Sequence, residues 1–196
     1  MISIDGTKMN NTLTRIWKGK QSLEMFYLEE YQSQTIAGGI VCGSANDRNA
    51  AVKYQVTLDN RWRIKTLKIY QLTKPYKFLI LSADYYKRWF DINNRHLPEL
   101  DGCVDIDISV TPFTNSLPIN RLGEELNETQ SLKVVYIKVP EFSVLPVLQR
   151  YTRIAERSYC YENEHTGFRS DLMVDEQGLV VTYPELFERI YPDAAN

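Results

Sequence analysis

The chain has 196 residues, of which 43% are hydrophobic and 24% charged, and its formal net charge is −2. This is ordinary globular usage, which excludes extended disorder, and a chain of this length buries a core without needing disulfides or metals. Basic and acidic residues are interspersed along the chain, which argues against a nucleic-acid partner. We therefore expect a single domain over residues 1–196.

The sequence also bears on compartment and cofactors. No apolar run near the N-terminus has the length of a signal peptide, and none approaches a membrane span. The cysteines Cys42, Cys103 and Cys160 are far apart and lack CxxC spacing, which favours reduced thiols. The chain has only two histidines, which argues against a zinc site or a His-dependent catalytic triad. We expect a cytoplasmic protein without an integral membrane segment, metal or cofactor.

The first third of the chain shows strand periodicity. Alternating residues predict strands over 13–17 and 23–31, although good helix formers leave a helix as the alternative for the second. Both faces of 23–31 carry apolar side chains, so this strand is covered on both sides or lies at a dimer contact. Residues 35–43 form a glycine-interrupted strand that predicts a bend or bulge, and residues 44–49 form a turn cluster.

The clearest hairpin follows. Apolar side chains alternate through residues 52–58, a turn falls at Asp59-Asn60, and the alternation resumes in 61–64. The apolar phase slips after residue 64, which predicts a β-bulge near Lys65-Thr66.

The remaining elements are mostly short strands. Pro146 lies inside one of them and marks it as an edge strand or a broken one. Pro184 and Pro192 bracket an amphipathic turn, which predicts a short C-terminal helix. About a dozen strands without strand–helix alternation indicate a mainly β fold, and no internal repeat is visible. The further strands are expected at residues 78–81, 86–90, 132–139, 142–152, 158–162, 168–174 and 179–182.

The segment 96–122, which we call the central segment, concentrates the polar chemistry. Cys103, Asp105 and Asp107 share one face of an expected strand. The two carboxylates suit an enzyme dyad, a hard-metal site completed by Asp101, or structural acceptors for backbone amides and arginines. The structural interpretation is the commonest, and Cys103 is better read as a buried thiol than as a nucleophile.

A polar run, residues 111–116, precedes an expected short helix over 117–122, which Pro118 starts and Gly123 ends. The amide-rich start of this helix could cradle an anionic or sugar ligand, or its polar residues could simply cap it. Tyrosine is frequent, with 13 residues, and suits either half-buried strands or a surface that binds sugars or lipid headgroups.

The stretch LDGCVDIDISVTPFTNSLPINRL resembles the signature of the putative glycolipid-binding family of bacterial proteins. The likeness extends to Trp17, the Tyr54–Trp62 hairpin, Trp89, residues 149–152 and residues 167–184. It implies a spiral β-roll: a many-stranded antiparallel sheet wrapped around one short-to-medium helix, in a protein that forms homodimers and has a glycolipid or other amphiphilic ligand. The chain departs from the pattern at Asn120, where a second arginine is expected, and this weakens a two-arginine anion clamp.

The leading hypothesis is a non-catalytic protein that binds a glycolipid or lipid-like amphiphile in the concave face of the sheet. The alternatives are a small enzyme that uses the cluster of Asp101, Cys103, Asp105 and Asp107, and a homodimeric interaction protein. The candidate ligand-binding residues are Asp101, Cys103, Asp105, Asp107, Thr111, Thr114, Asn115, Arg121 and Tyr151.

Overall fold

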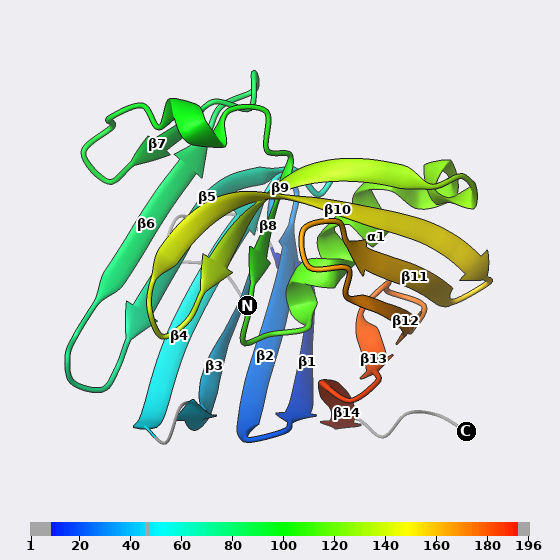
Figure 1. Ribbon diagram of the computed structural model, residues 1–196, viewed down its shortest axis with the longest axis horizontal. Coiled ribbons are helices and arrows are strands. Elements are labelled where there is room, and N and C mark those ends of the chain that lie inside the picture. The colour runs from blue at the N-terminus through cyan, green and yellow to red at the C-terminus, as the bar shows by residue number, and fades with distance from the viewer. Residues whose placement is uncertain (1–8, 46–47, 192–196) are drawn as a thin grey trace.

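The computed structural model of the protein describes residues 9–45 and 48–191. Fourteen strands form one continuous sheet, in the spatial order β7-β6-β5-β4-β3-β2-β1-β14-β13-β12-β11-β10-β9-β8. The sheet curls around a short helix and does not close into a barrel (Figure 1). The expected mainly β spiral fold is confirmed.

Hairpins join the first seven strands in chain order, and the last seven return from the far end of the sheet, so that β14 pairs with β1. All pairings are antiparallel except that of β8 with β9. The first group comprises β1 (Met9–Gly19), β2 (Ser22–Tyr31), β3 (Thr35–Ala45), β4 (Arg48–Leu58), β5 (Ile64–Gln71), β6 (Phe78–Ala83) and β7 (Trp89–Asp91). The second comprises β8 (Asp105–Ile108), β9 (Gln130–Lys138), β10 (Ser143–Ala155), β11 (Ser158–Asn163), β12 (Arg169–Val174), β13 (Val180–Tyr183) and β14 (Phe187–Tyr191).

The helical segment lies inside the curve of the sheet (Figure 1). It consists of a 3-10 turn η2 (Phe113–Asn115), the helix α1 (Ser116–Leu122) and a second 3-10 turn η3 (Gly123–Asn127); another turn, η1 (Pro98–Leu100), precedes β8. Gly123 has a φ of 54°, a backbone angle that glycine adopts readily, and it ends α1 as expected.

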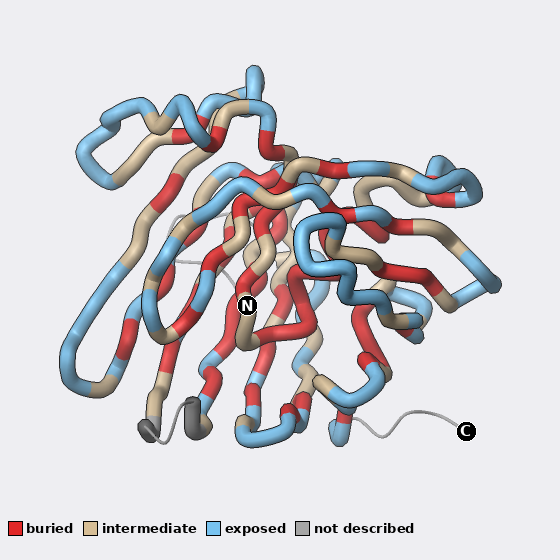
Figure 2. The backbone as a smooth tube through the Cα atoms, in the orientation of Figure 1, coloured by how far each residue is buried: buried red, intermediate tan, exposed pale blue. Residues whose placement is uncertain are grey.

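The core follows the inner face of the sheet (Figure 2), and buried residues alternate with more exposed ones along strands such as β2 and β5. Trp17, Phe26 and Phe113 form its aromatic centre, with ring centroids 5.0 Å and 4.8 Å apart for successive pairs. A second apolar cluster, which includes Tyr151 and Tyr161, fills the space between α1 and strands β9 to β13. Both clusters pack on the helical segment, which explains why a seven-residue helix is stable here.

Two irregularities of the strands agree with the sequence. Leu58 pairs with Ile64 and Thr57 with Thr66, so Lys65 is the extra residue of the expected bulge. Pro146 pairs with β9 only, because the register of β10 with β11 begins at Gln149. Pro146 therefore occupies an edge portion of β10, where its missing N–H costs no ladder bond. Of the expected turn cluster 44–49, residues 44–45 belong to β3 and residues 48–49 to β4, and residues 46–47 lie outside the described residues.

The expected C-terminal helix is wrong. Residues 184–186 form a turn, and Phe187–Tyr191 is the strand β14, which pairs with both β1 and β13. Phe187, Ile190 and Tyr191 favour strands, and two ladders of backbone hydrogen bonds outweigh the weak helix periodicity of so short a segment.

One loop recurs four times, beginning at Asp59, Asp84, Asp91 and Asp175. In each loop the aspartate Oδ1 accepts hydrogen bonds from the backbone N–H groups two and four residues later. The residue three positions after the aspartate has a positive φ, between 59° and 69°. We call this the Asp loop.

The first three Asp loops end in arginine, at Arg63, Arg88 and Arg95. A repeat is therefore present, although the sequence showed none, because Asp-x-x-x-Arg is short and unevenly spaced. The second loop spans residues 84–88 and replaces most of the strand that we expected over 86–90.

Candidate functional site

The central segment places its acidic side chains between β8 and the helical segment. Asp105 is fully buried, and Arg121 of α1 binds it through two hydrogen bonds, Nη2 to Oδ2 at 2.6 Å and Nε to Oδ1 at 3.2 Å. This bidentate geometry is the strong form of the arginine–carboxylate pair. Asp105 therefore ties β8 to α1, as the structural interpretation of this residue predicted.

Asp107 lies two residues further along β8 than Asp105. Gln149 Nε2 donates to its Oδ2 at 2.7 Å, and Thr114 Oγ1 donates to its Oδ1 at 3.3 Å. Burial raises the pKa of this carboxyl, whereas the two hydrogen bonds lower it. Neither partner carries a charge, so Asp107 lacks the counter-ion that Asp105 has.

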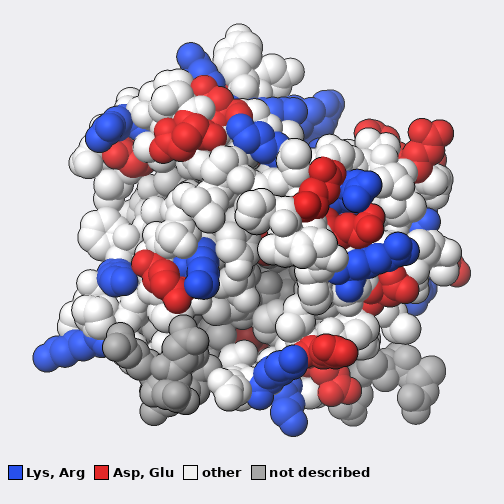
Figure 3. Space-filling model, viewed as in Figure 1, with Lys and Arg blue, Asp and Glu red and all other residues white. Residues whose placement is uncertain are grey.

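A cavity of about 390 Å³ opens beside Asp107, and we call it the tyrosine cavity. Four parts of the sheet enclose it: the end of β8, the β9–β10 hairpin, β11 with its following loop, and the β13–β14 turn. The face of the molecule is hollowed near its centre, where few charged side chains are visible (Figure 3). The lining includes Asp107, Thr111, Asn115, Tyr136, Leu145, Val147, Tyr161, Asn163, His165, Phe168, Tyr183 and Phe187.

One wall of the tyrosine cavity is a continuous aromatic cluster. Tyr161 lies at its centre, with ring centroids 6.2 Å from those of both Phe168 and Tyr183. Tyr183 in turn lies 6.2 Å from Phe187, and Tyr151 supports Tyr161 from behind at 5.3 Å. These spacings are those of offset and edge-to-face aromatic pairs, which hold the wall rigid.

Phenol groups surround the carboxylate. Burial raises the pKa values of Tyr136, Tyr151, Tyr161 and Tyr183, and the negative charge of Asp107 raises each of them further. The tyrosines thus stay protonated as hydrogen-bond donors over the physiological range. The cavity combines a broad apolar wall with one acceptor carboxylate, which is the composition of a site for a small, partly apolar ligand.

Comparison with known proteins agrees with this architecture. The sequence model of a family described as putative glycolipid-binding matches residues 14–189. The chain belongs to this family. A DUF1089 family protein from Pseudomonas aeruginosa, whose crystal structure was determined at 1.80 Å resolution, is 33% identical, with a TM-score of 0.79 over 88% of this chain and 94% of that one. No curated protein matches the chain.

The candidate residues of this family member divide between two places. Asp107, Thr111 and Asn115 border the tyrosine cavity, and Tyr151 donates to Asn115 Oδ1 at 3.0 Å just behind it. Thr114 reaches the site only through its bond to Asp107. The others lie towards the opposite end of β8 and do not reach the cavity: Asp101, Cys103, Asp105 and Arg121.

The four-residue cluster of the enzyme hypothesis is therefore not assembled. Asp101 lies at the surface, where His96 Nε2 contacts its two oxygens at 2.9 Å. Cys103 is buried, and desolvation raises the pKa of its thiol to about 11, which disfavours the nucleophilic thiolate. Asp105 is held by Arg121, and of the four residues Asp107 alone borders the tyrosine cavity.

A further buried carboxyl, which the sequence did not predict, lies on β2. Glu24 of β2 is 1% exposed, and its Oε1 accepts hydrogen bonds from Tyr54 Oη at 2.5 Å and Thr111 Oγ1 at 2.9 Å. Burial raises the pKa of Glu24 to about 8. The signal was its position among inward-facing apolar residues of β2, where a carboxyl is costly unless it is neutral or hydrogen-bonded.

Within residues 9–45 and 48–191, no three His, Cys, Asp or Glu side chains are grouped so that they could hold a metal ion. Among the helices of the same described residues, none has the length and apolar character needed to cross a bilayer.

Proposed function

We propose that the protein binds a glycolipid or a similar amphiphile without covalent chemistry, with the headgroup in the tyrosine cavity. The family description suggests such a ligand, and the observation that carries the proposal is the aromatic wall facing Asp107. A sugar ring has apolar faces and polar edges. It can therefore pack on Tyr161 and Phe168 while its hydroxyl groups donate to the Asp107 carboxylate.

The rim of the cavity suits the apolar part of such a ligand. Leu145 is 52% exposed and Phe168 41% exposed, and both border the opening. Large apolar side chains that remain exposed beside a cavity mark binding surfaces more often than isolated ones do. We place the acyl chains along these two residues.

Replacement of Phe168 by alanine should weaken binding, because it removes part of the aromatic wall without affecting the buried core. We expect a loss of about 1–2 kcal/mol, or roughly 5- to 30-fold in affinity, in titrations with short-chain glycolipids. Ile92→Ala is the control, because Ile92 is a large apolar residue that is 54% exposed but lies outside the tyrosine cavity.

Native mass spectrometry of the protein purified from cells supplies the direct test. A co-purifying lipid that is depleted in the Phe168→Ala variant supports the proposal. A consistently empty protein that binds no member of a glycolipid panel contradicts it.

We further propose that a second copy of the chain covers the outer face of the sheet. A cross-strand row of paired residues runs across this face: Tyr191, Ile16, Met25, Ile40, Lys53, Tyr70 and Phe78. All but Lys53 are apolar or aromatic, and Met25 is 56% exposed. Six inter-strand spacings make this row about 29 Å long. The exposed apolar side chains thus form a row across the sheet, whereas those on a typical surface are scattered singly.

A charge placed in this row should separate the subunits. Met25→Asp is expected to convert a dimer into a monomer in size-exclusion chromatography with light scattering, because it buries an unpaired carboxylate in the interface. Ile92→Asp is the control, because Ile92 is 54% exposed but lies in the third Asp loop. A wild-type monomer at micromolar concentration contradicts the proposal.

A further inference from the structure

A second groove lies at the opposite end of β8 from the tyrosine cavity. Two Asp loops, at residues 59–63 and 84–88, form its walls, and the C-terminal end of α1 closes it. Its volume is about 700 Å³. Trp89, Cys103 and Leu122 supply an apolar floor. We call it the basic groove.

Besides Arg121, four cationic side chains line the basic groove. Arg61, Arg63 and Lys65 come from the β4–β5 connection, and Lys87 faces them from the second Asp loop. All four are exposed, and none forms an ion pair with a carboxylate of the described residues. Arg63 instead lies over the ring of Tyr85, 5.9 Å from its centroid.

The carboxylates of the groove neutralise these cations only in part. Asp84 is paired with Arg88 at 2.7 Å, and Asp59 accepts two backbone N–H groups of its own loop. Glu125 also lines the groove, and Arg121 is already engaged by Asp105. The groove therefore keeps a positive excess.

The backbone of the groove explains how the cations are brought together. Lys65 is the bulged residue of β5, and bulges redirect a side chain relative to the regular pleat. Lys87 adopts a φ of 62°, which is uncommon for a residue with a side chain and is held here by the hydrogen bonds of the Asp loop. The sequence thus places cations at two special backbone positions on facing walls.

We infer that the basic groove binds an anionic group with phosphate-type oxygens. Guanidinium groups bind such oxygens in a bidentate manner, and ammonium groups add point charges. The apolar floor lowers the local dielectric and strengthens these contacts relative to open surface. Trp62 and Tyr85 at the sides can hold an apolar part attached to the anion.

The chemistry is shared by a soluble phosphate ester and a phospholipid headgroup, so the experiment has two arms. Inorganic pyrophosphate is titrated into the full chain by calorimetry, and vesicles of phosphatidylcholine, with or without phosphatidylglycerol, are tested by flotation. Arg63→Gln should weaken whichever binding is observed by about tenfold, the effect of one charge-assisted hydrogen bond. Lys65→Gln, which changes a separate backbone position, should weaken it in the same direction.

The third Asp loop offers a matched control. Arg95 ends this loop as Arg63 ends the first, and both are exposed, but Arg95 lies outside the basic groove. Arg95→Gln should leave binding unchanged. Binding of pyrophosphate identifies a soluble ligand class, and binding only of phosphatidylglycerol vesicles identifies a headgroup. Absence of binding in both arms, or equal loss in the Arg63→Gln and Arg95→Gln variants, overturns the inference.

Discussion

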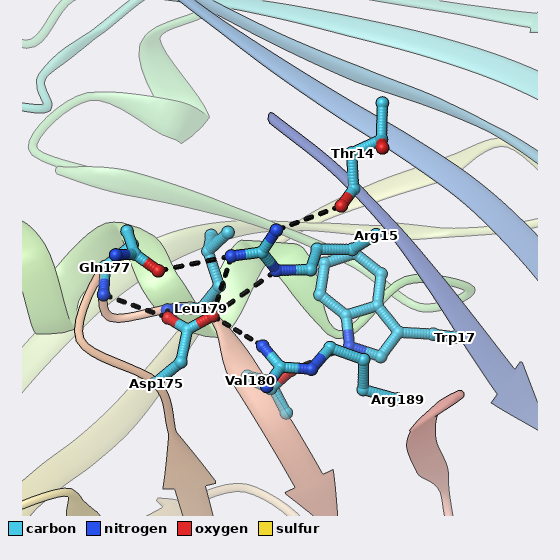
Figure 4. A network of polar contacts seen from close by, with 8 residues as sticks. All are labelled: Thr14, Arg15, Trp17, Asp175, Gln177, Leu179, Val180 and Arg189. Carbon is cyan, nitrogen blue, oxygen red and sulfur yellow. Dashed lines mark hydrogen bonds and ion pairs between the residues drawn. The ribbon is translucent and has the colours of Figure 1, made fainter. Parts of the chain in front are cut away.

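Replacing Asp175 with asparagine should lower the free energy of unfolding by about 3–5 kcal/mol, because it leaves two buried arginines without their counter-ion. The Oδ2 atom of Asp175 lies 3.1 Å from Arg15 Nη2 and 2.5 Å from Arg189 Nη1 (Figure 4). The three side chains are 12%, 11% and 7% exposed, so water can hydrate the freed guanidinium groups only poorly.

The location of this network explains why its loss should affect the whole molecule. Arg15 lies on β1 and Arg189 on β14, the two strands that join the halves of the sheet. Trp17 adds a hydrogen bond from its Nε1 to the Val180 carbonyl oxygen at 2.7 Å across the same junction (Figure 4). Asp175 thus anchors the turn between β12 and β13 to the seam where the two halves meet.

The third Asp loop provides a control, because it has the loop hydrogen bonds without an ion pair among the described residues. Asp91 accepts the same two backbone N–H groups, from Asn93 and Arg95, but it forms no ion pair among the described residues. Asp91→Asn should therefore cost about 1 kcal/mol or less. Urea denaturation of both variants provides the measurement. Equal destabilisation would show that the loop hydrogen bonds, rather than the buried charges, stabilise the junction.

Much of the fold was predictable because apolar alternation is a local property. Both faces of the strand over residues 23–31 carry apolar side chains, and one face proved to lie on the core and the other in the outer row. The phase slip after Ile64 located a bulge to within one residue, since a slip of one position turns every later side chain to the other face. Pro146 likewise predicted the edge portion of β10, because the missing N–H group of a proline is a local property of the sequence.

The features that escaped prediction depend on pairing between distant segments. The last strand was taken for a helix because its two ladders, with β1 and β13, are invisible in its own sequence. The candidate site likewise depends on contacts between segments that are distant in the sequence. The shared face of Asp105 and Asp107 was predictable, but their different partners, Arg121 and Gln149, come from the packing of α1 and β10. The aromatic wall comes from β11 to β14, and only the high tyrosine content hinted at it.

The stability of the wild-type protein should fall as the pH rises from about 4.5 to about 8, and Glu24 is the cause. Below pH 4.5 its carboxyl is protonated in both the folded and the unfolded chain. Between these pH values the unfolded chain releases the proton, whereas the folded protein, in which burial raises the pKa of Glu24 to about 8, retains it. Each pH unit therefore costs about 1.4 kcal/mol, and the total loss is on the order of 4 kcal/mol.

Glu24→Gln isolates this effect. Its Oε1 can still accept the hydrogen bonds of Tyr54 and Thr111, but the side chain cannot ionise. The variant should be no more stable than the wild type at pH 4.5 and markedly more stable at pH 8 in urea denaturation. Glu29→Gln, on the outer face of the same strand, should follow the wild-type curve. If the curves of the Glu24→Gln variant and the wild type run parallel across this range, Glu24 is ionised in the folded protein, and Thr111 then links a buried charge to the tyrosine cavity.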